Sequence, residues 1–135
     1  MEELSVSEHL SDGQRVDGKK EGHWITYYAN GNKKSEGEYK NGQKEGKWTL
    51  YHQNGNKQSE ATFRNGLYEG HYVSYHKNGN KFREGTYGEH QGNSYDGRKE
   101  GVWYQYEADG KTISTKVIYK HGRVVKRVNE PPFYT

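Results

Sequence analysis

The histidines are considered first, because an imidazole can ligate a metal ion or act as a general base. His52 and His76 occupy equivalent positions of a pattern that recurs about every 24 residues. If each recurrence contributes two strands, these two side chains lie about 10 Å apart. Zinc binds nitrogen at about 2 Å, so the pair cannot share one ion. We therefore expect neither a metal site nor a cofactor in this chain.

Serine and glutamate are the other residues that could carry hydrolytic chemistry. Ser35, Ser59 and Ser74 lie in polar segments whose spacing indicates neither a strained elbow nor a paired histidine. A glutamate precedes a glycine in every repeat, and it is expected to stabilise a turn or to pair with an adjacent lysine. These glutamates are Glu21, Glu45, Glu69 and Glu100. We expect no enzymatic activity.

Aromatic side chains form two rows, which are better candidates for a binding site and also the main material for a core. The first row is Trp24, Trp48, Tyr72 and Trp103, and the second is Tyr27, Tyr51, Tyr75 and Tyr106. A separation of three places the rows on opposite faces of a regular strand, whereas a bulge could bring both to one face. Exposed Tyr and Trp rimmed by charge are typical of a protein-binding hot spot. The residues expected to flank it are Tyr28, His52, His76 and Glu107.

These residues belong to a unit of about 24 residues that occurs four times. Asn-Gly or Asp-Gly pairs recur from Asn30-Gly31 to Asp109-Gly110, and such pairs are the strongest short-range signal of a hairpin turn. The segments between them are about eight to ten residues long, which suits strands. We expect an all-β fold, an elongated single-layer antiparallel meander of about four stacked hairpin repeats.

Glycine occupies two kinds of position in this pattern. Ten glycines, Gly13 among them, follow Asn, Asp or His and are interpreted as turn residues. Gly37 and Gly85 fall in the middle of predicted strands, where the second repeat has Ala61. A small residue at that point predicts a large ring lying over the strand.

The chain divides into three parts on these signals. Residues 1–17 are expected to form an acidic lead-in or cap, 18–128 the repeat array with a polar insertion at 88–94, and 129–135 an extended tail. There is no cysteine, and no apolar run approaches the length of a membrane span. The acidic start lacks a signal-peptide pattern, so we expect a cytoplasmic location for the chain as given.

The net charge of +3 is unevenly distributed. No carboxylate occurs from Lys111 to Arg127. The segment is either an edge strand protected by lysines or a weak patch for acidic partners, anionic lipid or nucleic acid. The candidate patch consists of Lys116, Lys120, Arg123, Lys126 and Arg127.

Four units of the chain resemble MORN repeats, namely EGHWITYYANG, EGKWTLYHQNG, EGHYVSYHKNG and EGVWYQYEADG. The shorter bacterial variant, with an EGxWxxYxxNG core, is the most similar, and the resemblance extends over about Gly18–Val128. It implies elongated sheets of stacked hairpins that serve as scaffolds or dimerisation platforms, with proposed contacts to anionic phospholipids. Some bacterial variants are described as antitoxins of toxin–antitoxin pairs. Tyr72 in place of tryptophan and the insertion depart from the pattern.

We therefore expect a non-enzymatic scaffold that binds a protein partner through an aromatic and charged sheet face. The partner could be a second copy of the chain or a cognate toxin. The alternative is a ligand-binding array for anionic lipid head groups or cell-surface carbohydrate. Nucleic acid is disfavoured, because a net charge of +3 is small for six or more phosphate contacts.

Overall fold

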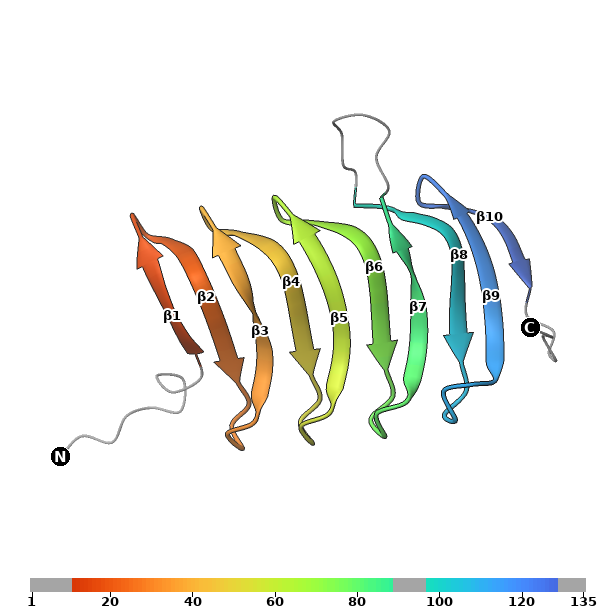
Figure 1. Cartoon of the computed structure of the whole chain (residues 1–135), viewed down its shortest axis with the longest axis horizontal. Helices are drawn as coiled ribbons and strands as arrows, with labels where there is room; N and C mark the ends of the chain where they lie inside the picture. The colour runs from red at the N-terminus through yellow and green to blue at the C-terminus, as the bar shows by residue number, and fades with distance from the viewer. Residues whose placement is uncertain (1–10, 89–96, 129–135) are drawn as a thin grey trace.

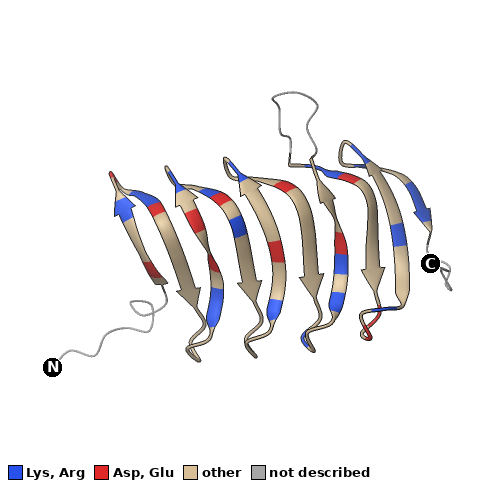
Figure 2. Ribbon diagram, viewed as in Figure 1, with Lys and Arg blue, Asp and Glu red and all other residues tan. Residues whose placement is uncertain are grey.

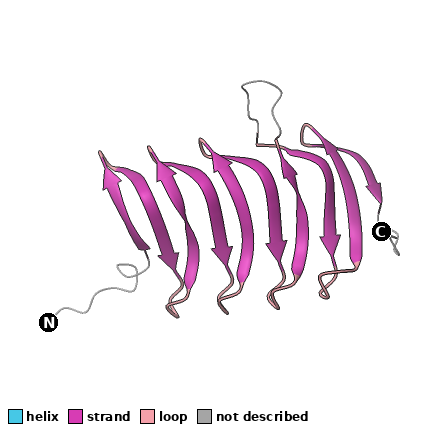
Figure 3. Cartoon of the chain, in the orientation of Figure 1, coloured by secondary structure: helices cyan, strands magenta, loops and turns pink. Residues whose placement is uncertain are grey.

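The computed structural model describes residues 11–88 and 97–128, which consist of strands and loops (Figures 1 and 3). Ten strands form one antiparallel sheet in the order of the sequence, so each strand pairs with its neighbours along the chain. The predicted single-layer meander is thereby confirmed. The strands are β1 (Ser11–Val16), β2 (Lys19–Tyr27), β3 (Lys33–Lys40), β4 (Gln43–Tyr51), β5 (Lys57–Arg64), β6 (Leu67–Tyr75), β7 (Lys81–Tyr87), β8 (Lys99–Tyr106), β9 (Ile113–Lys120) and β10 (Arg123–Val128).

Two of the expected segments are only partly described. β1 lies within the segment 1–17 that was expected to form a lead-in or cap, and it pairs with β2 along its length. Most of the insertion at 88–94 and the whole tail at 129–135 lie outside the described residues.

Two kinds of turn close the hairpins. Asn41-Gly42 is a two-residue turn in which both residues have positive φ, 52° and 81°. Asparagine and glycine tolerate that conformation best, and its twist matches that of the paired strands. The turn around Gly31 is longer: the Tyr28 N–H donates to the Asn32 carbonyl at 2.8 Å, and Gly31 has a φ of 91°. The turn positions predicted between described strands are confirmed except at Gly13, and they fall into these two classes.

The even-numbered strands β2 to β8 bend sharply near their beginnings (Figure 1). Gly46 lies at the bend of β4 with a φ of 75°, a conformation that is easy for glycine alone. At this point the pairing of β3 with β4 is irregular. Between the paired residues Glu36↔Thr49 and Glu38↔Glu45, β3 has one residue, Gly37, and β4 has three, the last of which is Trp48. The Trp48 side chain therefore has no directly opposite neighbour on β3.

The core is a row of rings that lie on glycine backbone. Trp24, Trp48 and Trp103 are only 7%, 3% and 3% exposed. A Cβ atom added to Gly37 would lie 2.2 Å from the Trp48 ring, and one on Gly85 would lie 2.1 Å from the Trp103 ring. The prediction that a ring covers each of these mid-strand glycines is confirmed.

Gly13 belongs to the same class, so its interpretation as a turn residue was wrong. It lies inside β1, and an added Cβ would stand 2.2 Å from the Trp24 ring. In sequence Asp12-Gly13 is indistinguishable from an Asp-Gly turn pair. The physical reason for this glycine is instead the close approach of the indole to the backbone.

Candidate partner-binding surface

Each odd-numbered strand from β1 to β7 presents an acidic residue followed directly by a small one. Because consecutive residues of a strand point to opposite faces, the acid lies on one face and the small residue on the other. The next strand supplies an aromatic ring to the small residue and, three positions later, a tyrosine near the acid. The two aromatic rows therefore lie on opposite faces, as predicted for regular strands. These acid–small pairs are Asp12-Gly13, Glu36-Gly37, Glu60-Ala61 and Glu84-Gly85.

The first aromatic row defines the tryptophan face. Each indole N–H donates to the backbone carbonyl of the residue that follows the small one. The Trp48 indole, for example, donates to the backbone carbonyl oxygen of Glu38 at 3.0 Å. In the third repeat Tyr72 replaces tryptophan and is partly buried beside Ala61. The structure thus places these predicted site residues in the core, which is made of Trp24, Trp48, Tyr72 and Trp103 with Tyr39, Phe63 and Tyr68 around them.

Lysine side chains cover the buried rings. The Lys44 Nζ lies 4.9 Å from the ring centroid of Trp48 and 5.0 Å from that of Phe63, which is cation–π distance. Burial, with a smaller effect from the charge of Lys20, lowers the pKa of Lys44. The sequence had not indicated these contacts. Lys20 and Lys99 make equivalent contacts, with Trp24 and Trp103 respectively.

The glutamates that precede the bend glycines serve turns in the next hairpin. The Glu45 carboxylate accepts a hydrogen bond from the Asn65 N–H at 2.9 Å. Glu21 and Glu100 accept in the same way from the Asn41 and His121 N–H groups. The predicted turn-stabilising role is confirmed at these three positions.

The second aromatic row defines the tyrosine face. All four side chains are partly buried, so each offers part of its ring to solvent. Burial and the bond to Glu84 raise the pKa of Tyr106. Hydroxyls of this row donate to the acids of the acid–small pairs: Tyr27 to Asp12 at 3.0 Å, Tyr75 to Glu60 at 3.1 Å and Tyr106 to Glu84 at 2.8 Å.

Glu60 illustrates how the acids of the tyrosine face are held. Its carboxylate pairs with Lys47 at 2.8 Å and with Lys57 at 3.1 Å, and it accepts the Tyr75 hydroxyl. The hydrogen bond from Lys47 is the largest contribution that lowers the pKa of Glu60 to about 2. The carboxylate is therefore ionised at neutral pH and fixes the orientation of the tyrosine.

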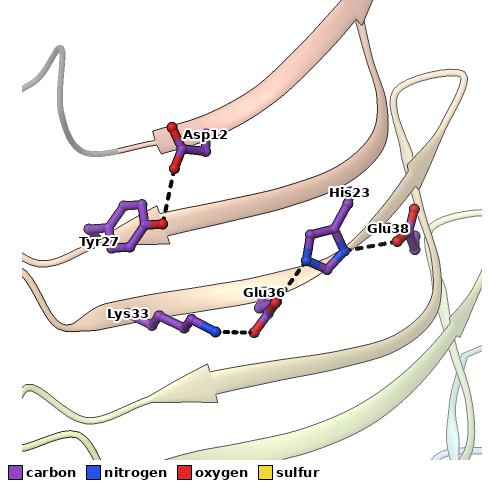
Figure 4. A network of polar contacts seen from close by, with 6 residues as sticks. All are labelled: Asp12, His23, Tyr27, Lys33, Glu36 and Glu38. Carbon is purple, nitrogen blue, oxygen red and sulfur yellow. Dashed lines mark hydrogen bonds and ion pairs between the residues drawn. The ribbon is translucent and has the colours of Figure 1, made fainter.

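At the N-terminal end of the tyrosine face, His23 joins two carboxylates (Figure 4). Its Nδ1 lies 2.8 Å from Glu38 Oε1 and its Nε2 lies 2.8 Å from Glu36 Oε2. Only the protonated imidazole can donate from both nitrogens. The bonds to Glu38 and Glu36 accordingly raise the pKa of His23. Glu36 is also paired with Lys33 at 2.9 Å.

The predicted flanking strip lies along the turns and connects successive repeats. Its polar atoms face the carbonyl oxygens at the ends of the next even-numbered strands, which orients the rings along the array. Tyr28 Oη donates to the Tyr51 oxygen at 2.6 Å, His52 Nε2 lies 3.0 Å from the Tyr75 oxygen and His76 Nε2 lies 3.1 Å from the Tyr106 oxygen.

An asparagine ladder beside this strip was not predicted. Asn54 and Asn56 both donate from Nδ2 to the Lys77 oxygen, each at 2.8 Å. The sequence signal is an Asn-Gly-Asn triplet that recurs every 24 residues, of which only the turn pair was interpreted. The ladder fixes the spacing of the turns and so keeps the tyrosine row in line. Its other members are Asn30 and Asn32, which bind Gln53, and Asn78 and Asn80, which bind Ala108.

The candidate basic patch lies at the C-terminal edge of the sheet, where β9 and β10 carry Lys and Arg (Figure 2). Val124 and Val125 of β10 are 49% and 64% exposed. The edge strand is thus both basic and apolar. Lys116 is partly buried, and Lys120, Arg123, Lys126 and Arg127 are exposed.

The candidates for catalysis are distributed without a common centre. Ser59 and Ser74 are buried on the tryptophan face, and Ser35 is bonded to Thr26. Within residues 11–88 and 97–128, no three His, Asp or Glu side chains gather closely enough to hold a metal ion. The same stretches include no helix with the length and apolarity to cross a membrane.

Comparison with known proteins gives one family. The family described as MORN repeat variant matches three consecutive repeats, at residues 20–41, 44–65 and 68–88. Each interval covers one even-numbered strand except its first residue, and the whole odd-numbered strand that follows. No curated protein matches the chain.

Proposed function

We propose that this chain, which belongs to the MORN repeat variant family, is a non-enzymatic scaffold that binds a protein partner through its tyrosine face. MORN repeats form a non-catalytic family of interaction repeats that bind proteins or membrane lipids. The partner is a protein in this proposal, either a second copy of the chain or another protein such as a cognate toxin.

The observation that carries the proposal is the uncovered row of tyrosines. Within the described stretches 11–88 and 97–128 the single sheet carries no second layer over this face, and the row follows the order of the strands along it. Tyrosine contributes a large contact area at a small entropic cost, and it is enriched at binding hot spots. Tyr75 and Tyr106 are already held by Glu60 and Glu84, so little side-chain ordering remains to oppose binding.

The charges of this face favour a protein over a lipid surface. Three acids of this face, Glu36, Glu60 and Glu84, are paired with lysines. Such pairing weakens the long-range field that attracts anionic lipid. A specific observation does favour lipid at the opposite end of the array, where the basic strand β10 exposes Val124 and Val125. Anionic lipid is therefore the second candidate, through β10. Carbohydrate stacking on the rings has no comparable support.

The proposal is tested by affinity capture from the native cell lysate with the full chain as bait. The bait is compared with Tyr51→Ala/Tyr75→Ala, which alters the tyrosine face, and with Lys126→Gln/Arg127→Gln, which alters β10. We expect a stoichiometric protein that is retained by the β10 variant and lost by the tyrosine variant. Equal recovery by the folded tyrosine variant, or no specific protein at all, would contradict the proposal.

A further inference from the structure

A recess with an unusual collection of cations lies at the C-terminal end of the tryptophan face. It has a volume of about 240 Å³, and its walls include the rings of Trp103 and Tyr119. Arg83, Lys99 and Arg127 also line it, and none of the lining residues within 11–88 and 97–128 is a carboxylate. The recess is therefore positively charged and has flat apolar sides.

The repeat pattern explains why this space is open. In β1, β3 and β7 the small residue of the acid–small pair is covered by the tryptophan of the next strand. β9 has Lys116-Val117 at the corresponding place, and β10 contains no tryptophan. Val117 faces Arg127 across the strand pair instead. Among the residues that the structure describes, none takes the place of the next indole beside Trp103.

The three cations are available to a ligand. Arg83 donates to Gln105 Oε1 at a long distance of 3.3 Å, and Lys99 lies 5.0 Å from the centroids of both Trp103 and Tyr119. None of the three forms an ion pair with a described carboxylate. The cations Lys20 and Lys44 lie over rings of this face, whereas eight described acids are on the other face or bound to turns. Acids of the tyrosine face are Asp12, Glu36, Glu38, Glu60 and Glu84, and those bound to turns are Glu21, Glu45 and Glu100.

We propose that this recess, which we call the cationic recess, binds a carboxylate side chain of an acidic peptide segment. Planar guanidinium groups match the two oxygens of a carboxylate, and the flanking rings accept an apolar neighbour of the acid. This site is on the opposite face from the tyrosine row, so it goes beyond the proposed function and does not depend on it.

An extended peptide fits the shape of this face better than a membrane does. A second recess of about 310 Å³ shares Arg83 with the first, and its other walls include Leu50, Tyr72, Tyr75 and Phe82. The residues that line the two recesses come from β4 to β10. A chain of alternating acidic and apolar side chains can reach both recesses. A lipid head group at a flat bilayer surface would have to leave that surface to reach cations between ring walls.

The test uses the full chain and a labelled peptide of alternating glutamate and leucine, with a glutamine–leucine peptide as its neutral match. Binding is measured by fluorescence anisotropy, and the indole N–H signals of the three tryptophans are followed by NMR. We expect saturable binding of the glutamate peptide that shifts the Trp103 signal and leaves the Trp24 signal in place. Loss of each guanidinium should weaken binding about tenfold or more.

The variant Arg83→Gln/Arg127→Gln is compared with Lys33→Gln/Lys57→Gln, which removes the same charge from the tyrosine face. Arg127→Gln alone, at an exposed position of an edge strand, covers the case in which the double variant fails to fold. The control should bind as the unchanged chain does. Equal binding of the neutral peptide, an equal loss in the control, or binding to vesicles of phosphatidylcholine and phosphatidylserine without binding to the peptide would overturn the proposal.

Discussion

Replacing Gly37 by alanine tests the central packing unit of the array. The added Cβ would stand 2.2 Å from Trp48 Cδ2, whereas ordinary contact begins near 3.4 Å, so the indole must retreat by about 1.2 Å. That movement also breaks the bond from the indole N–H to the Glu38 oxygen, now 3.0 Å long. Overpacking costs about 1–3 kcal/mol and a lost hydrogen bond about 1 kcal/mol. Alanine recovers about 0.5–1 kcal/mol of chain entropy. We expect Gly37→Ala to lower the free energy of unfolding by about 2–3 kcal/mol.

The second and third repeats together supply the compensating change, because Ala61 of the second lies beside Tyr72 of the third. The double variant Gly37→Ala/Trp48→Tyr reproduces this combination. We expect it to be more stable than the sum of its single changes predicts, by about 1 kcal/mol or more. Ala61→Gly is the matched control and should cost less than about 1 kcal/mol, since it removes one methyl group and relieves no clash.

Urea unfolding followed by circular dichroism measures these differences, with equal m-values as the check that the unfolding transition is unchanged. A repeat array can lose cooperativity, so the same transition should be seen by tyrosine fluorescence. If the double variant loses the plain sum of the single losses, the ring does not lie on the glycine as described. A Gly37→Ala chain as stable as the original would refute the reasoning altogether.

Two further perturbations test the polar contacts. The pKa of His23 is raised above its ordinary 6.5 by its bonds to Glu38 and Glu36, so its contribution to stability is complete below pH 6.5 and is lost as the pH rises through the folded-state value. His23→Gln should flatten the stability profile in that window, measured by urea unfolding at a series of pH values; an unchanged slope would contradict the network. Glu45→Ala should lower the free energy of unfolding by about 1 kcal/mol, because the Asn65 N–H loses its acceptor. Glu45→Gln keeps an acceptor and should cost less, and equal losses in the two variants would count against the bond.

Much of the fold could be predicted because the chain uses the same local signal many times. The Asn-Gly pairs mark hairpins wherever they occur between strands of suitable length, and the small residue at Gly37 and Gly85 indicates a ring above it. Gly13 shows the limit of this reasoning. A glycine after aspartate has two physical explanations, a positive φ or a close approach, and only the position of the Trp24 ring distinguishes them.

The candidate site was predicted in its residue types more than in its contacts. The separation of Trp48 and Tyr51 indicates opposite faces once the strand is known to be regular between them. Nothing local shows that the indole sinks onto the preceding strand while the tyrosine stays partly exposed. That difference depends on the bend at Gly46. There the register of β4 shifts against β3, while its pairing with β5 continues without a shift from Gly46 to Leu50. The bonds of His52 and Asn54 to the next repeat likewise depend on the stacking distance between turns.

The most direct test of the scaffold proposal is the affinity of the purified captured partner for the full chain, measured by titration calorimetry at about 0.5 M salt, where surface charge is screened. The Tyr51→Ala/Tyr75→Ala variant is measured beside it after its fold has been verified by circular dichroism. Removing a hot-spot tyrosine costs about 2 kcal/mol of binding free energy, so the variant should bind at least about 30-fold more weakly. High salt should leave the affinity of the unchanged chain nearly as it is. An unaffected affinity in the variant, or binding that disappears in salt, would contradict a tyrosine face that binds protein.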